Sequence, residues 1–128
     1  MLNFVSEQEG IGAAVLIRSC EIVKGHELVR KRRGGLDGPV LLTGPGKVGQ
    51  ALALDTSMSG WVLFGGSELE VLEGAAPTRL LHGRRIGVEY AKPRDAKALW
   101  RFAAPDTQWV SHRGKLKPMK RRSGVEFA

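Results

Sequence analysis

Residues 13–18, with the sequence Ala-Ala-Val-Leu-Ile-Arg, place a compact apolar run directly before a cation. Consecutive apolar residues bounded by polar ones are typical of a short buried strand, and we expect a strand over residues 13–22. Arg18 stands out because burial disfavours a charged group that has no partner. Its guanidinium either reaches water or pairs with Glu21, or it serves a function, and the residues alone leave these interpretations open.

The chain on both sides of this run alternates between short apolar patterns and breaks rich in glycine. The breaks lie at residues 34–39, 65–66 and 74–77. The spacing of apolar residues predicts helices over residues 27–33 and 47–54, and strands over residues 67–73, 85–88, 99–102 and 109–111. Short strands with two helices favour an α+β fold, with a mixed, mostly antiparallel sheet of short strands, over repeated βαβ units.

The length of 128 residues fits one domain, and a hydrophobic content of 42% with 26% charged residues argues against wholesale disorder. No apolar run approaches the roughly 18 residues that span a bilayer, so we expect no membrane partner. The first residues lack the basic and long apolar segments of a signal peptide. The single cysteine, Cys20, suits a reducing compartment. We therefore expect a cytoplasmic protein, associated with the nucleoid if it is bacterial.

The net charge of +7 is unevenly distributed along the chain. Residues 1–64 carry a net charge of +1 and residues 65–128 a net charge of +6, and cations cluster at residues 30–33 and 113–122. Such a surplus indicates a polyanionic partner, most often a nucleic acid. The alternative interpretation is a solvated face together with a disordered tail.

A glycine-rich loop precedes the second predicted helix, with the sequence Gly-Pro-Gly-Lys-Val-Gly over residues 44–49. It matches the dinucleotide-binding pattern G-x-G-x-x-G, although Pro45 lacks an N–H group that would face a pyrophosphate. A second interpretation is a loop in which Gly44, Gly46 and Lys47 hold one backbone phosphate of DNA. A third is a plain turn with a surface lysine.

The remaining chemistry-bearing residues form no recognisable site. The three histidines are scattered and Cys20 has no partner at ligand spacing, so we expect no metal site and no cofactor. The three tryptophans, Trp61, Trp100 and Trp109, are interpreted as packing in the core or at its rim rather than as platforms for stacked bases.

Several segments, in their order along the chain, resemble the 3-methyladenine (alkyladenine) DNA glycosylase family. The matching stretches include residues 13–18, 43–47, 72–74, 85–88, 100–102 and 109–111. The resemblance implies a domain with a barrel like that of the formyltransferase C-terminal domain. It also implies base excision repair, in which an alkylated or deaminated purine is flipped out of double-stranded DNA and its N-glycosidic bond is hydrolysed.

The resemblance also implies roles for individual residues. Arg18 resembles the arginine that helps to position the attacking water, and Ile86 resembles the residue whose main-chain carbonyl holds that water. Asn3 resembles the asparagine that lines the base pocket. Lys47 resembles a lysine that contacts a DNA phosphate.

The family's segment with the catalytic glutamate has no counterpart in this chain. We therefore expect residues 1–111 to form the later part of the glycosylase domain and residues 112–128 to form a basic, flexible tail, and we expect a monomer if the domain is complete. Activity of this chain by itself is left open. The alternatives are a non-catalytic DNA-binding remnant and a dinucleotide-binding fragment.

Overall fold

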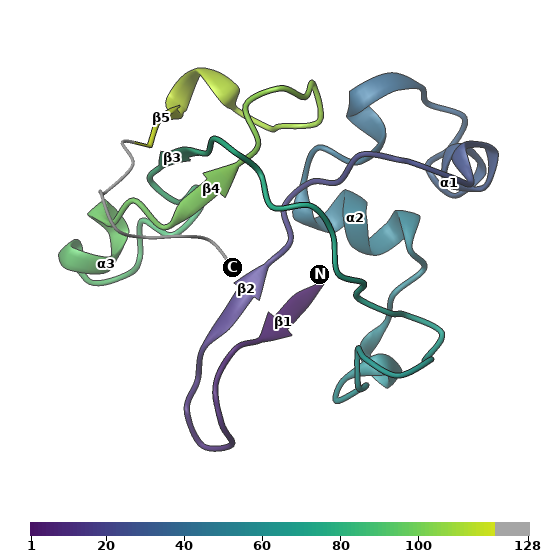
Figure 1. Cartoon of the computed structure of the whole chain (residues 1–128), viewed down its shortest axis with the longest axis horizontal. Helices are drawn as coiled ribbons and strands as arrows, with labels where there is room; N and C mark the ends of the chain where they lie inside the picture. Colours follow the sequence, from purple (N-terminus) through teal and green to yellow (C-terminus); the bar gives the residue numbers. More distant parts are fainter. Residues whose placement is uncertain (120–128) are drawn as a thin grey trace. The chain divides into compact units, whose positions relative to one another are not determined.

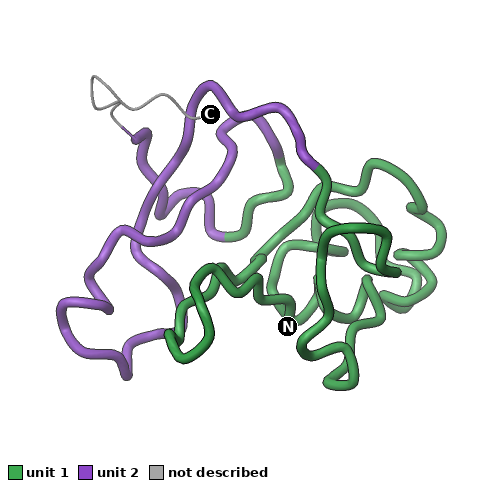
Figure 2. The backbone as a smooth tube through the Cα atoms, turned by 60° about the horizontal axis from the view of Figure 1, so that its bottom comes forward, with its two compact units in different colours: residues 1–72, 108–111 green, residues 73–107, 112–128 purple. Residues whose placement is uncertain are grey.

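The computed structural model describes residues 1–119 and has an α+β architecture (Figure 1). Its short strands pair antiparallel in two open sheets, and three α-helices occur among these residues. This confirms the predicted α+β class with few helices and short antiparallel strands. The chain divides into two compact units, which Figure 2 colours separately. Unit 1 comprises residues 1–72 and 108–111, and unit 2 comprises residues 73–107 and 112–128.

Unit 1 combines a hairpin with two short helices. Its regular elements are β1 (Asn3–Val5), β2 (Ala14–Leu16), α1 (His26–Arg32), the 3-10 helix η1 (Gly38–Leu41), α2 (Pro45–Ala51) and the 3-10 helix η2 (Thr56–Met58). β1 and β2 pair antiparallel, with Asn3 opposite Leu16 and Val5 opposite Ala14. An isolated antiparallel bridge joins Ser19 to Thr43.

The helix ends in unit 1 follow from local chemistry. Gly25 precedes α1 with φ of 82°, a left-handed conformation that glycine adopts without steric penalty. Proline occupies the first turn of α2, where its missing N–H would have no partner within the helix. Asp37 Oδ1 accepts a hydrogen bond from Gly38 N at 2.8 Å and so caps η1.

A small core joins η1 to α2. It consists of Leu41, Leu42, Val48 and Ala51, with half-buried residues that include Ile17, Val29 and Trp109 packed against it. Leu41 and Val48 are fully inaccessible to solvent. Because this core holds few side chains, each of them contributes a large share of the apolar burial in unit 1.

Two arginines fasten α1 to the core. Arg32 Nη1 donates to Ala51 O at 2.8 Å, and Arg33 Nε donates to Leu41 O at 3.1 Å. In the opposite direction, Gln50 Nε2 donates a hydrogen bond to Arg32 O at 3.1 Å. Cations beside the last carbonyls of α2 also oppose the negative end of its dipole. Half of the cationic cluster at residues 30–33 therefore has a structural role.

Unit 2 is built around a three-stranded antiparallel sheet of order β4-β3-β5. Its elements are β3 (Leu81–Gly83), α3 (Pro93–Lys97), β4 (Arg101–Ala103), the 3-10 helix η3 (Arg113–Lys115) and β5 (Lys117–Pro118). Arg113 Nη1 donates to Thr107 O at 2.7 Å, which anchors η3. Leu116 is buried beneath the sheet. Within the predicted tail, residues 113–115 form η3 and residues 117–118 form β5, which belongs to this sheet. Residues 120–128 lie outside the described residues.

Several element predictions need correction. The two helices are confirmed, but the predicted strand over residues 13–22 is shortened to β2 and the bridge at Ser19. The predicted strands over residues 67–73, 85–88 and 109–111 are wrong, because these segments are loops and bends. The strand expected over residues 99–102 forms later, as β4. Short apolar runs form strands only where a partner strand reaches them, and distant parts of the chain supply that partner.

Candidate nucleic-acid interface

The glycine-rich loop leads into α2, and its lysine folds back over it. A Cβ atom built on Gly44 would lie 3.5 Å from Lys47 Cδ and 3.7 Å from Lys47 Cγ. The methylene stem of Lys47 therefore lies along Gly44. Val48 N donates to Gly44 O at 3.0 Å, whereas the N–H groups of Gly46 and Lys47 are in the first turn, where a helix provides no acceptor. The structure thus brings together the three residues that the sequence predicts as a phosphate loop.

Arg18 lies beside this loop. The antiparallel bridge pairs Ser19 with Thr43, so the backbones of Arg18 and Gly44, each one residue from the bridge, lie close together. The preceding residue, Ile17, packs against the core. Arg18 is half-buried, and its Nε is inaccessible to solvent with no hydrogen-bond partner among residues 1–119. A buried N–H group without an acceptor lowers the stability of the fold, unless a ligand or a water molecule accepts its hydrogen bond.

Asn3 belongs to the same unit as Arg18. It lies in β1 directly opposite Leu16 and is exposed. The pairing continues past β2, because Ile17 N donates to Leu2 O at 3.0 Å. Arg18 is the next residue after Ile17. Asn3 and Arg18 therefore lie on backbone segments that are neighbours in the hairpin.

Ile86 belongs to unit 2. It lies in a bend after β3, is half-buried, and precedes Gly87, whose φ of 74° is left-handed. The bend exists because glycine tolerates this conformation.

The cysteine lies against the core of unit 1. Burial raises the pKa of the Cys20 thiol, because an apolar environment disfavours the thiolate. The thiol is therefore a poor nucleophile in the folded chain. No cluster of three or more metal-ligating side chains occurs among the described residues. Within residues 1–119, no helix has the length and apolar character needed to cross a bilayer.

The charge of the two units differs in sign. Unit 1 holds seven Lys and Arg against eight Asp and Glu, whereas the described residues of unit 2 hold ten against four. The two halves of the sequence carry net charges of +1 and +6, whereas unit 1 and the described residues of unit 2 carry −1 and +6. The difference in charge is therefore larger between the units than between the halves. A unit with a net charge of +6 is typical of proteins that bind a polyanion.

The interpretation of the tryptophans holds for one residue and not for another. Trp109 packs against the core of unit 1, as predicted. Trp100 is 56% exposed, and Phe102 beside it is equally exposed. The sequence contains no signal for this exposure. The alternation of two aromatic residues with Arg101 would place the rings inward and the cation outward, whereas Arg101 is the buried residue.

Comparison with known proteins places this basic protein in a family. The profile of the methylpurine-DNA glycosylase family matches residues 1–108, and the chain belongs to that family. It is 51% identical over 122 residues to a "DNA-3-methyladenine glycosylase" of Arabidopsis thaliana. The aligned residues make up 93% of this chain and 48% of that protein. It is 50% identical over 118 residues to a "Putative 3-methyladenine DNA glycosylase" of Nitrosococcus oceani, with coverage of 92% and 59%.

The chain spans about half the length of the curated relatives it matches. A third relative, a "Putative 3-methyladenine DNA glycosylase" of Chlorobaculum tepidum, is 36% identical and is covered over 59% of its length. No solved structure gives a significant match. Family membership does not favour the alternatives of a non-catalytic remnant or a dinucleotide-binding fragment.

Proposed function

We propose that the chain acts in base excision repair, as part of an enzyme that hydrolyses the N-glycosidic bond of alkylated or deaminated purines in double-stranded DNA. The observation that carries this proposal is the family match over residues 1–108. The target base must leave the duplex before its sugar carbon can be reached. A water molecule must then be held against that carbon and deprotonated.

Arg18 is proposed to position that water. Its Nε is inaccessible to bulk solvent and lacks a partner among the described residues, so it retains a donor for a bound molecule. In unit 2, the carbonyl of Ile86 is proposed to accept a bond from the attacking water, the role that the resemblance implies for it. Asn3 is exposed on β1 and is proposed to line the pocket that receives the flipped purine.

Lys47 is proposed to contact a backbone phosphate, with Gly44 and Gly46 allowing the backbone to approach it. The stem of Lys47 rests on Gly44, which restricts the positions available to the ammonium group. A contact of this kind fixes the register of DNA without reading its sequence. It also makes affinity depend on salt, because phosphate contacts release counterions.

The catalytic carboxylate is proposed to lie in the part of the relatives that this chain does not cover. The resemblance assigns none of the carboxylates of this chain to that role. We further propose that the complete domain is a monomer with the barrel implied by the resemblance, and that it works in the cytoplasm or nucleoid. Residues 1–111 are proposed as its later part, and residues 112–128 as the basic segment that follows, of which η3 and β5 pack on unit 2.

A chimera tests this function. The 118 matched residues of the Nitrosococcus oceani relative are replaced by the corresponding residues of this chain, and the product is incubated with duplexes that contain hypoxanthine or an alkylated adenine. Alkali then converts abasic sites to strand breaks. We expect breaks above the no-protein control and none in the undamaged duplex. A folded but inactive chimera, beside an active unmodified relative, would overturn the proposal.

A further inference from the structure

One face of the sheet in unit 2 carries a row of three side chains across its three strands. His82 on the central strand lies opposite Phe102 on β4 and opposite Lys117 on β5. Residues directly opposite one another in antiparallel strands project from the same face. An aromatic ring, an imidazole and an ammonium group therefore form one line, called here the Phe102 row.

The opposite face of this sheet is covered. Gly83 and Arg101, which are paired across β3 and β4, are both buried. A Cβ atom on Gly83 would lie 2.7 Å from Lys115 O and 2.9 Å from Leu116 Cδ2, so the chain before β5 crosses directly over it. By contrast, Phe102 and Lys117 are exposed. The Phe102 row is therefore the open face of the sheet, with an apolar ring left in solvent.

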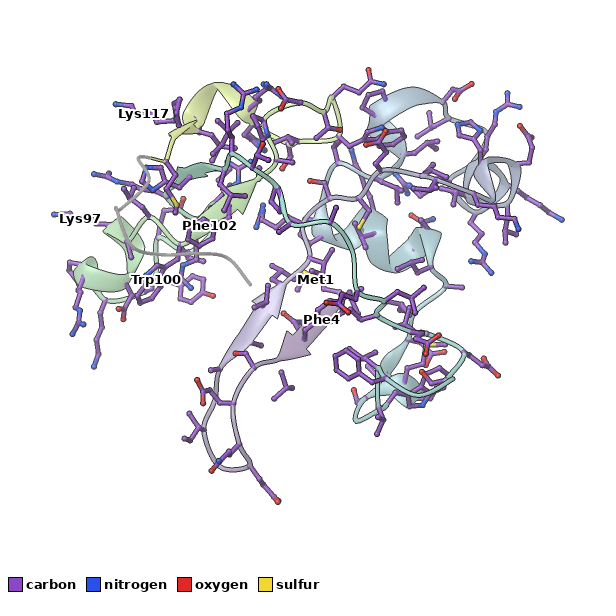
Figure 3. The ribbon with its side chains drawn as sticks, in the orientation of Figure 1. Met1, Phe4, Lys97, Trp100, Phe102 and Lys117 are labelled. Atoms are coloured by element: carbon purple, nitrogen blue, oxygen red, sulfur yellow. The ribbon has the colours of Figure 1, made fainter. Side chains whose placement is uncertain are left out.

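A second aromatic ring lies close to the row in sequence. Trp100 precedes Phe102 by two residues, an interval that places side chains on one side of an extended backbone. The guanidinium carbon of Arg85 lies 5.2 Å from the centre of the Trp100 ring. Arg85 is itself held by a 3.0 Å bond from Nη2 to Asp95 O. Figure 3 shows the side chains of Trp100, Phe102 and Lys117 together with that of Lys97, which ends α3.

The unit that carries these rings is positively charged. The described residues of unit 2 have a net charge of +6, and one of their four carboxylates, Asp106, already lies 3.1 Å from Arg79. Exposed rings interspersed with cations are the features that bind unpaired nucleotides, because bases stack on the rings and cations neutralise the phosphates.

We propose that the Phe102 row, together with Trp100, binds single-stranded DNA. Bases stack on Phe102 and Trp100, and Lys117 and Lys97 neutralise the phosphates between them. Single strands are favoured over duplex DNA because the ring faces of bases are available only when the bases are unstacked. The inference goes beyond the proposed function, since it requires no damaged base, no bond cleavage and no residue of the phosphate loop.

The test measures binding of the whole chain to a fluorescein-labelled 12-nucleotide oligo(dT) by anisotropy. Phe102→Ala is expected to weaken binding about five- to 100-fold, and Phe102→Tyr should restore most of it because a ring is retained. Lys117→Ala should lower the slope of log affinity against log salt by about 0.7. Phe64→Ala and Lys24→Ala are the matched controls, since both residues are exposed in unit 1. Neither control should change the affinity by more than about twofold.

Further measurements separate the possible outcomes. Quenching of tryptophan emission by oligo(dT) should be smaller in Trp100→Phe, because the stacked indole is removed. An equal loss of affinity for duplex DNA in Phe102→Ala would overturn the preference for single strands. Equal affinities of Phe102→Ala and Phe64→Ala would overturn the site itself. Self-association of the chain that Phe102→Ala abolishes would show that a second copy covers this face, and would also refute the proposal. Circular dichroism spectra identical to the wild type establish that each variant is folded.

Discussion

Gly83 is the point in unit 2 at which a single methyl group should have the largest effect. An alanine Cβ at this position would lie 2.7 Å from a backbone oxygen and 2.9 Å from the side chain of Leu116. Both distances are shorter than van der Waals contact, and the nearer atom belongs to the backbone, so a side-chain rotation cannot relieve the clash. Gly83→Ala must therefore displace the segment that carries η3 and β5.

The size of the effect follows from what that displacement exposes. Leu116 is 9% exposed, and removing a leucine side chain from its buried environment costs about 1.5–3 kcal/mol. A loss of about 2 kcal/mol raises the population of the open segment about 30-fold. Where opening and closing are fast compared with proteolysis, cleavage rises by the same factor.

Limited trypsin digestion with mass spectrometry measures this opening at the bond after Lys115. We expect cleavage about 30-fold faster in Gly83→Ala than in the wild type. Gly74→Ala is the control, because a Cβ atom at Gly74 meets nothing within 4 Å and its backbone is not left-handed. Equal cleavage rates in the two variants would refute the reasoning, since the close approach at Gly83 would then not hold the segment in place.

Other predictions concern unit 1. Leu41→Ala should lower the free energy of unfolding by about 2–5 kcal/mol in urea titrations, whereas Val40→Ala, at a position 42% exposed, should change it by less than about 1 kcal/mol; similar losses would contradict the position of the core. Burial raises the pKa of Cys20, so the unfolded chain ionises first as pH rises. Stability should therefore fall as pH rises through and above the ordinary pKa of the thiol, about 9, in the wild type, and fall less in Cys20→Ala. In the chimera, Arg18→Ala should slow base release in single turnovers more than it weakens DNA binding. Lys47→Ala should weaken binding and lower the salt slope by about one; equal effects on both measurements in either variant would contradict the assigned roles.

The two α-helices of unit 1 could be predicted because their information is local, whereas the five-residue α3 of unit 2 was not predicted. Val48 and Ala51 have helical spacing and are buried, and the glycine and proline residues before the helices mark where they begin. The strands could not be predicted equally well. β3 pairs with β5, so Leu81 meets Pro118 across a long stretch of sequence, and no short window contains both partners. Residues 85–88 have a strand-like pattern but find no such partner and form a bend.

The candidate site was predicted in its residues but not in its connections. The loop at Gly44 and the cation at Arg18 are both conspicuous in the sequence, whereas the bridge from Ser19 to Thr43 that joins them is a tertiary contact. The basic cluster at residues 30–33 has contacts that the sequence does not reveal. Arg32 and Arg33 donate to carbonyl groups of α2 and η1, and these acceptors lie outside the cluster in sequence.

The uneven burial of unit 1 has a consequence for hydrogen exchange. The hairpin of β1 and β2 has three residue pairs and two outer edges, and Val5 and Val15 are largely exposed on it. Its amides should therefore exchange through local fraying, whereas those of α2, which lie over the buried Val48 and Ala51, should exchange only in larger openings. A molecule that binds beside Asn3 would slow the first class of amides and leave the second unchanged. The exchange rates of a few hairpin amides would therefore report whether a molecule is bound beside Asn3.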